Sequence, residues 1–536
     1  MSEQKHHMEP PATDRPLDDS HTQTSLSNDG EKPDGVVASS DSDKGQSPAV
    51  EPEYYSGLRL WIIMSTIFLS TLLSALDIGI VATAIPGITD EFHRLDDVGW
   101  YGAACFLLVG ASSPMWGKLY MFFSAKTVYL ASVVIFLVGS VVAAAAPNSE
   151  SIIVGRAFQR PGLIGMWMGV FMFSTIIGPI IGGAFTSEVT WRWCFWINLP
   201  VGGVILALLV VFFKVPRHIS PMPATWTEIL LQLDIPGFSL LVTSLVCFTL
   251  ALQWGGLTKP WSDGSVVATL VMWIVLTIAF FVTEYFQGAR AMVPLRLLKP
   301  RMTWANALYG WMSCSISPIY FQSIHGQTAI ESGVNNLPFM AFFAFGAIVS
   351  GTLIGKTRFL QPYELVSGLL ATAGAALLYT LEVDSSLARY IGPQVLFGLG
   401  IGLGNQVPMT ALQSFSKPED IASTTAVMLM CNSISGAYFV AAAQGLFSNR
   451  LLQTLAVIAP SINPTKVLIT GATEIQDVFA GEELRLVREA YMVGIKDVFA
   501  FSMAGAALTV LIAMIIPFKR LPSHDATEKK EVVAAL

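Results

Sequence analysis

The chain has 536 residues, of which 53% are hydrophobic and only 13% are charged, and its mean hydropathy is +0.57. Soluble domains carry roughly 25% charged residues, so this composition excludes an ordinary soluble protein. The formal net charge is −7, and the sequence has no clustered basic segment, which excludes nucleic acid as a partner.

Residues 1–57 hold twelve acidic side chains against four basic ones. They are rich in Ser, Asp, Pro and Gly, so they bury too little apolar surface to fold. We expect a disordered acidic tail on the cytoplasmic side of a membrane. No apolar stretch typical of a signal peptide precedes the first hydrophobic run, so that run should act as the insertion signal and remain in the mature protein.

From Leu58 onward, apolar runs of about 20 residues recur, and each can cross a hydrocarbon core of about 30 Å as a helix. Backbone groups in lipid must be bonded within their own segment, and the runs lack the alternation of a membrane barrel. The sequence therefore predicts an all-α, polytopic membrane protein with thirteen spans. The expected spans are 60–84, 98–121, 127–146, 162–186, 196–214, 235–254, 265–287, 302–323, 333–355, 362–381, 390–413, 422–447 and 494–517.

Basic residues gather in alternate short loops, which the positive-inside rule places on the cytoplasmic side. We expect five parts along the chain. They are the tail 1–57, an N-terminal helical bundle at 58–217, a linker with two extra membrane helices at 218–301, a C-terminal bundle at 302–521 with a long external loop at 448–492, and a cytoplasmic tail at 522–536.

The loop charges contradict each other at one place. The third span should leave the cytoplasm, yet Arg156 and Arg160, before the fourth span, also indicate a cytoplasmic loop. Residues 147–161 would have to cross back, but at 1.5 Å per helical residue they reach only about 22 Å. The sequence thus contains one crossing too few.

No residue pattern indicates an enzyme or a metal site. The cysteines and histidines lie apart, without metal-ligand spacing. There is no GxSxG elbow, HExxH, Walker sequence or GxGxxG after a strand. We therefore expect no catalysis and no cofactor, and an ion gradient rather than ATP as the energy source.

Asp77 lies inside the first span, where a carboxyl costs about 2.5–3.5 kcal/mol on insertion scales and usually faces a cavity or a partner. Such a group suits proton loading from alternate sides of the membrane. Asp77→Asn should then abolish proton-coupled transport and leave expression intact. The alternative is that Asp77 only accepts hydrogen bonds from a neighbouring helix and holds the fold.

Neutral polar side chains within the later spans are candidates for a substrate cavity, because an amphipathic cargo needs an apolar pocket with a few hydrogen-bonding groups. For each of them an interhelical hydrogen bond is an equally good interpretation. These candidates are Asn306, Asn405, Gln406, Gln413 and Asn432.

Five motifs occur in order, and together they resemble the major facilitator superfamily, specifically the fourteen-helix drug:proton antiporters of fungi. The resemblance runs from about Leu58 to Leu521. It implies two six-helix halves that rock about a midplane cavity and export a toxin, drug or secondary metabolite against protons. The motifs are LDIGIVATAIP at 76–86, WGKLY at 116–120, GRAFQ at 155–159, GPIIGG at 178–183 and WRWCFWINLP at 191–200.

The resemblance also implies residue roles. Asp77 matches the acidic residue of the first-helix motif, and Arg156 matches an arginine of the fourth helix that takes part in proton coupling. As the sequence stands, an interfacial anchor that extends to the headgroups is the favoured role for Arg156. Lys118 and Lys126 match the basic residues of the loop signature between the second and third helices. Their first expected role is to set the topology, and their second is to hold one conformation of the transporter.

Gly178, Pro179, Gly182 and Gly183 match the antiporter motif of the family. Glycines permit close helix contact, and proline removes a backbone donor and bends the helix. Ordinary packing of small residues is the alternative interpretation.

The family places its fourth helix directly after GRAFQ, but here Gln159 is joined to Arg160 and Pro161. We expect that about one helix has been lost there, either naturally or through a wrong exon boundary. This explains thirteen spans where the family has fourteen.

Two rival functions remain open. One is a degenerate paralogue that senses but does not transport; the other is uptake of a nutrient or an iron chelate. For the favoured efflux function, the expected partners are a small molecule, protons and the lipid bilayer, and the expected state is a monomer. We expect the plasma membrane, with vacuolar or vesicular membranes as alternatives.

Overall fold

The computed structural model describes residues 57–92, 98–159, 174, 177–178, 181–186, 188–214, 223–313, 335–417, 420–464, 467 and 475–522. These residues belong to one compact unit. Within them the chain is helical, and only two isolated β-bridges occur. The all-α prediction is confirmed. The expectations for the two tails concern residues outside this part of the chain.

The first half contains four helices before the junction at Gln159. Ser124 caps the third by accepting a hydrogen bond from the Thr127 N–H, and Asn148 caps the fourth at the Ser151 N–H. The helices of this half are α1 (Gly57–Phe92), α2 (Val98–Phe122), α3 (Ala125–Ala144), α4 (Ser149–Phe158), α6 (Trp193–Trp196) and α7 (Asn198–Phe212).

The linker holds the two extra apolar helices that the sequence predicts. Asp234 caps the first of them from a left-handed conformation with φ of 50°, and a proline occupies its first turn, where the missing N–H costs nothing. The linker elements are α8 (Trp226–Gln232), α9 (Ile235–Trp254), α10 (Gly264–Gln287), η2 (Gly288–Arg290) and α11 (Leu295–Leu298).

In the second half, two long helices continue beyond the predicted spans. Helix α19 extends to Ile458 and α22 begins at Gly481, so helix occupies much of 448–492. The elements are α12 (Arg301–Met312), α15 (Leu337–Thr357), α16 (Gln361–Tyr379), α17 (Leu387–Asn405), α18 (Val407–Phe415), α19 (Ile421–Ile458), α21 (Ile475–Val478) and α22 (Gly481–Ile515).

Nine helical segments among the described residues are long and apolar enough to cross a membrane. Helix α10 shows the surface expected of one, because its apolar side chains Val271, Ile274, Ile278 and Phe281 are exposed. An exposed apolar surface of this kind is the one that a membrane-spanning helix presents to lipid. The count of thirteen stays a prediction, since the expected spans 162–186 and 302–323 are described only in part.

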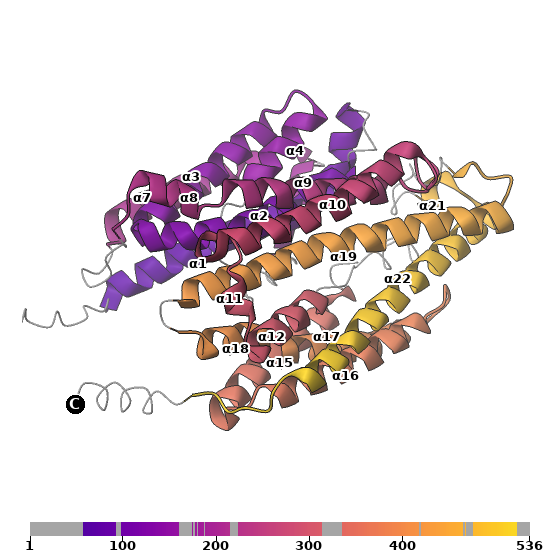
Figure 1. Ribbon diagram of the computed structural model, residues 1–536. Coiled ribbons are helices and arrows are strands. Elements are labelled where there is room, and N and C mark those ends of the chain that lie inside the picture. The colour runs from indigo at the N-terminus through magenta and orange to yellow at the C-terminus, as the bar shows by residue number, and fades with distance from the viewer. Residues whose placement is uncertain are drawn as a thin grey trace, which may run out of the picture. The chain divides into compact units, whose positions relative to one another are not determined.

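Helices α2 and α19 run side by side and join the two halves (Figure 1). Helix α9 packs on α10 and also contacts both α2 and α19. In the second half, α17 packs between α15 and α16, and α16 also packs along α22. In the first half, α4 lies against α3 and α2, which places its last turn beside α1.

Candidate functional site

Asp77 and Arg156 form an ion pair in the interior of the first half. Arg156 Nη1 lies 2.9 Å from Asp77 Oδ2, and the two side chains are 2% and 0% exposed, respectively. Asp77 lies within α1, and Arg156 lies in the last turn of α4. The sequence analysis selects both residues, and the structure brings them together.

The position of α4 is fixed by close backbone packing. A methyl group at Gly155 would lie 2.7 Å from Ala143 N and 2.8 Å from Gly139 O, which is closer than carbon atoms approach these groups. Only glycine therefore permits this contact with α3. The contact holds Arg156, the next residue, at a set depth.

Three neutral polar side chains complete the surroundings of the pair. Asn198 Nδ2 donates to Asp77 Oδ1 at 3.3 Å, and Arg156 Nη1 also donates to Gln159 Oε1 at 3.2 Å. Both Asn198 Nδ2 and Gln159 Nε2 lie 3.1 Å from Ser140 Oγ. The network thus connects α1, α3, α4 and α7, and a change of charge at Asp77 would be felt by all four.

Arg156 is not the interfacial anchor that the sequence analysis favours. Its Nε donates to the Tyr101 carbonyl, and its side chain is buried. A carboxylate and two further acceptors within the protein replace the headgroups, so the guanidinium has no need to extend to the interface. Sequence reasoning missed Gln159 and Asn198 as partners, although both lie in the motifs GRAFQ and WRWCFWINLP.

The glycine motif lies against α1 close to the ion pair. A methyl group at Gly178 would lie 2.8 Å from Gly79 Cα, and Gly79 is two residues after Asp77. This geometry is the close helix contact that both interpretations of the motif require. Gly182 is buried and Gly183 is partly buried, whereas Pro179 lies outside the described residues.

Lys118 is not a loop residue. It lies inside α2 and is 6% exposed. Its Nζ donates to the backbone carbonyls of Gln232, Arg290 and Ala291. Lys118 is the lysine of WGKLY, which the sequence analysis assigns to a loop, but the linker folds over it and supplies acceptors.

Two buried carboxyls accompany Lys118. Asp234 Oδ2 accepts from the Met292 N–H at 3.0 Å, and Glu284 Oε2 accepts from the Val293 N–H at 2.7 Å. Both side chains belong to the linker and are 1% exposed. Lys118 therefore ties the linker to α2. Lys126 lies in the first turn of α3, where its Nζ donates to the Val210 carbonyl at 2.7 Å.

The predicted span 390–413 is interrupted near its middle. Helix α17 ends at Asn405 and α18 begins at Val407. Pro408 has no N–H for the helix ladder, and the Gln406 N–H bonds the Gly404 carbonyl instead. Discontinuous helices at midplane depth are typical of substrate and ion sites in transporters. Asn405 and Gln406 lie at this interruption and are partly buried.

The other substrate candidates are less uniform. Asn306 is fully buried, and its Nδ2 donates to the Met302 carbonyl, while Oδ1 has no partner among the described residues. Asn432 on α19 packs near α12, since a methyl group at Gly310 would lie 3.1 Å from its Oδ1. Gln413 is exposed and contacts Thr425 Oγ1 at 3.3 Å. The structure thus groups Asn306 and Asn432 around α12.

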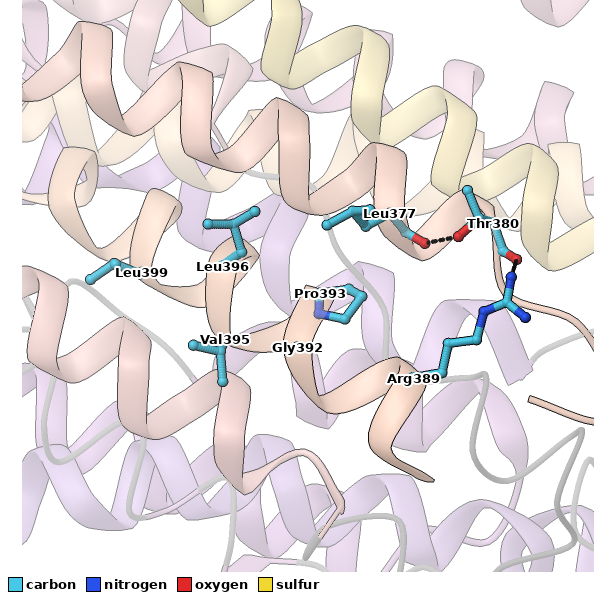
Figure 2. Close-up of a pocket in the computed structure, with 8 residues that line it drawn as sticks. All are labelled: Leu377, Thr380, Arg389, Gly392, Pro393, Val395, Leu396 and Leu399. Carbon is cyan, nitrogen blue, oxygen red and sulfur yellow. Dashed lines mark hydrogen bonds between the residues drawn. The ribbon is translucent and has the colours of Figure 1, made fainter. Parts of the chain in front are cut away.

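A separate cavity of about 510 Å³ lies between the ends of α16 and α17 (Figure 2). Its walls are mainly aliphatic, and Arg389 lies at one end, where its Nη2 donates to the Thr380 carbonyl at 3.4 Å. None of the predicted substrate residues lines it. We therefore centre the candidate site on the Asp77 pair and on the interruption at Gln406.

The motifs, the helical fold and the buried pair can now be compared with known proteins. The model of the Major Facilitator Superfamily matches residues 67–160 and 159–440. The chain belongs to this superfamily. The two matched segments meet at Gln159 and Arg160, which is the junction where the sequence predicts a missing helix.

Similar superfamily members from fungi are efflux pumps and exporters. The efflux pump notK of an Aspergillus species (strain MF297-2) is 70% identical, over 90% of this chain and 91% of its own. Dehydrocurvularin exporters are 60% identical in Alternaria cinerariae, over 91% of this chain and 89% of theirs, and 59% identical in Aspergillus terreus, over 92% of each.

Solved structures of other proteins share the fold. A peptide transporter of the POT family matches 87% of this chain and 99% of its own with a TM-score of 0.51 at 14% identity. A double tryptophan mutant of XylE matches 87% of this chain and 98% of its own, also with a TM-score of 0.51, at 10% identity. The two-bundle transporter fold is therefore confirmed.

The alignments with the fungal superfamily members are longer than the stretch of this chain that they cover. The alignment with notK is 511 positions long, but it covers 90% of the 536 residues of this chain, which is about 482 residues. Roughly 29 aligned positions therefore have no counterpart in this chain. The alignment with the exporter of Aspergillus terreus is 525 positions long and covers 92% of this chain, so roughly 32 of its positions have no counterpart here. One membrane-spanning helix needs about 20 residues. The number of positions that this chain lacks therefore exceeds the length of one such helix.

Proposed function

We propose that this chain exports an amphipathic secondary metabolite from a fungal cell in exchange for protons, by alternating access. It is a multi-pass membrane protein of the Major Facilitator Superfamily, and its similar relatives include an efflux pump and exporters of dehydrocurvularin. The cargo, the proton coupling and the plasma membrane as its location are the proposal.

The observation that supports proton coupling is the buried pair of Asp77 and Arg156. Protonation of Asp77 removes the negative charge that holds Arg156, so the guanidinium must find other acceptors. Gln159, Ser140 and Asn198 are within reach of the same network. Proton binding would therefore rearrange contacts among α1, α3, α4 and α7, and this couples a proton to the movement of helices.

The observation that supports an amphipathic cargo is the polar interruption at Asn405 and Gln406 within an otherwise apolar span. Asn306 Oδ1 adds a buried acceptor without a partner among the described residues. Neutral amides bind hydroxyl and carbonyl groups of a cargo without a charged ligand. Charged nutrients or iron chelates would require cationic side chains here, which disfavours the uptake alternative.

Transport in inside-out vesicles from cells that express the chain tests this proposal. Dehydrocurvularin is a suitable probe because relatives export it. We expect uptake into the vesicles when their lumen is acidic, and none when the pH gradient is collapsed. Uptake that persists without the gradient would contradict proton coupling.

A test of two chains in parallel distinguishes efflux from the alternative function of a non-transporting paralogue. One is the chain as written, and the other carries a helix restored between Gln159 and Arg160. If neither moves any of a panel of hydrophobic compounds, although both reach the membrane, the sensor alternative replaces efflux. A fluorescent fusion distinguishes plasma from vacuolar membrane, and the mass of the purified particle tests the monomer.

A further inference from the structure

Glu364 is a buried carboxyl that the proposed function has not used. It lies in the first turn of α16, and its side chain is 0% exposed. Among the described residues, neither Oε1 nor Oε2 has a hydrogen-bond partner. The apolar cluster at this level of the second half includes Leu360, Ile512 and Ala513. A carboxylate in such a place would have neither a donor nor a counter-ion.

A polar track passes the backbone carbonyl of Glu364 and continues along α16. The Tyr309 hydroxyl donates to the backbone carbonyl of Glu364 at 3.1 Å and lies 2.9 Å from Ser367 Oγ. Ser367 is one turn further along the same helix face. Tyr309, Ser367, Ser502 and Thr509 line a cavity of about 20 Å³, which is room for about one water molecule.

Among the described residues, the helices packed around Glu364 present no charge to it. On α12 the titratable neighbour is Tyr309. The charges of α22 lie between Glu482 and Asp497, at the opposite end from Thr509, and Arg389 lies at the far end of α17. The basic residues at the near ends of α12, α15 and α22 are exposed: Arg301, Lys356, Arg358, Lys519 and Arg520.

We propose that Glu364 is a second proton-binding site, located in the C-terminal half of the transporter. A buried carboxyl without a donor or counter-ion is stable only in its neutral form, so Glu364 holds a proton in the arrangement seen here. On release, the O–H bond breaks, the electron pair stays on the carboxylate and the proton passes to water that enters along the Ser367 track. Its role in transport rests on the proposed function, whereas its protonation does not.

Infrared spectroscopy of the full chain in lipid nanodiscs tests the protonation directly. A protonated carboxyl has a carbonyl stretch that a carboxylate lacks. We expect this band at neutral pH in the wild type and its loss in Glu364→Gln, with no change in Glu382→Gln, an exposed glutamate just after the same helix. An identical band in the wild type and in Glu364→Gln would overturn the proposal.

The folding of the variant is itself informative. Glutamine has the size and neutrality of a protonated glutamate, so Glu364→Gln should fold as well as the wild type. Glu364→Lys places a charge in the same apolar position and should lower the yield of folded protein. A Glu364→Gln chain that fails to fold would contradict a neutral Glu364.

Transport distinguishes a proton site of the cycle from a structural one. In proteoliposomes with dehydrocurvularin as the probe, Glu364→Gln should lose accumulation driven by a pH gradient and retain exchange of labelled for unlabelled compound. Equal gradient-driven accumulation in Glu364→Gln and wild type would refute the role in the cycle. If the wild type itself accumulates no probe, the proposed function fails, and the infrared result still decides whether Glu364 binds a proton.

Discussion

Arg156 Nη1 lies 2.9 Å from Asp77 Oδ2, across 79 residues of sequence, with both side chains withdrawn from solvent. Removing either charge while the helices keep this arrangement is costly, because the pair and its hydrogen bonds offset the cost of desolvation. The first-helix motif and GRAFQ are therefore one structural unit.

The first prediction concerns this dependence. Asp77→Asn should abolish pH-driven transport and should also lower stability by about 3–5 kcal/mol, because Arg156 is left as an uncompensated buried charge. The sequence alone predicts intact expression for this variant, so the ion pair changes the expectation. Thermal unfolding of a fluorescent fusion, followed by size-exclusion chromatography, measures the loss.

The double variant provides the control. Adding Arg156→Gln to Asp77→Asn removes both charges, so stability should recover while pH-driven transport stays absent. If the single and double variants are equally unstable, the pair does not behave as a coupled unit.

The second prediction separates the two lysines of the loop signature. Lys118→Met should destabilise the chain by about 3–5 kcal/mol, because three carbonyls lose a donor and the neighbouring carboxyls lose their cation. Lys126→Met is the matched control, and this partly exposed residue should change stability by less than about 0.5 kcal/mol. Equal melting temperatures for the two variants would show that the tie to the linker contributes little.

The third prediction concerns pH at the end of α1, beyond the predicted span 60–84. Burial pulls the pKa of Glu91 upward, but hydrogen bonds from Arg192 and Trp191 outweigh it and leave the pKa lowered. Glu91 thus adds stability above the ordinary carboxyl pKa, and this stability is lost as pH falls through the lowered value. In Glu91→Gln, the melting temperature should therefore depend less on pH in the acidic range than in the wild type.

The size of this effect is limited, because the Glu91 side chain is 44% exposed and exposed pairs contribute about 0.2–1 kcal/mol. Glu188 is an exposed carboxyl in the same half, so Glu188→Gln serves as the control. Parallel curves of melting temperature against pH for the wild type and Glu91→Gln would count against a stabilising role for the contacts of Glu91 with Arg192 and Trp191.

The fourth prediction concerns the junction of Gln159 and Arg160. Helix α4 has 10 residues, about 15 Å at 1.5 Å per residue, which is half of a hydrocarbon core. We expect the transcript to encode a further helix of about 20 residues at this point. Sequencing of complementary DNA across the junction is the measurement. A transcript that joins the two residues as written, with robust export by its product, would defeat this expectation.

Much of the fold follows from hydropathy. The prediction 98–121 agrees with α2, and 235–254 has the same limits as α9. Length and apolarity determine these helices, and no distant contact is needed. The interruption at Gln406 was missed because the apolar run continues across it, although Pro408 was the available signal.

The candidate site was only half predictable. Asp77 and Arg156 stand out as charges beside apolar residues, but their pairing depends on the depth at which Gly155 sets α4 against α3. Glu364 gives no such signal, because its burial comes from α22 and α12, which are distant in sequence. Hydropathy shows that a residue enters the membrane, and tertiary packing decides which neighbour it finds there.

The linker helices also affect how a cargo can reach the transporter. Helix α9 contacts both α2 and α19, Lys118 holds the linker to α2, and Trp273 of α10 donates to the Tyr438 hydroxyl of α19 at 2.8 Å. The pair α9 and α10 therefore shields one flank of the seam between the halves. A compound dissolved in the bilayer would meet the linker on that flank, so lateral entry from lipid would have to use the opposite side.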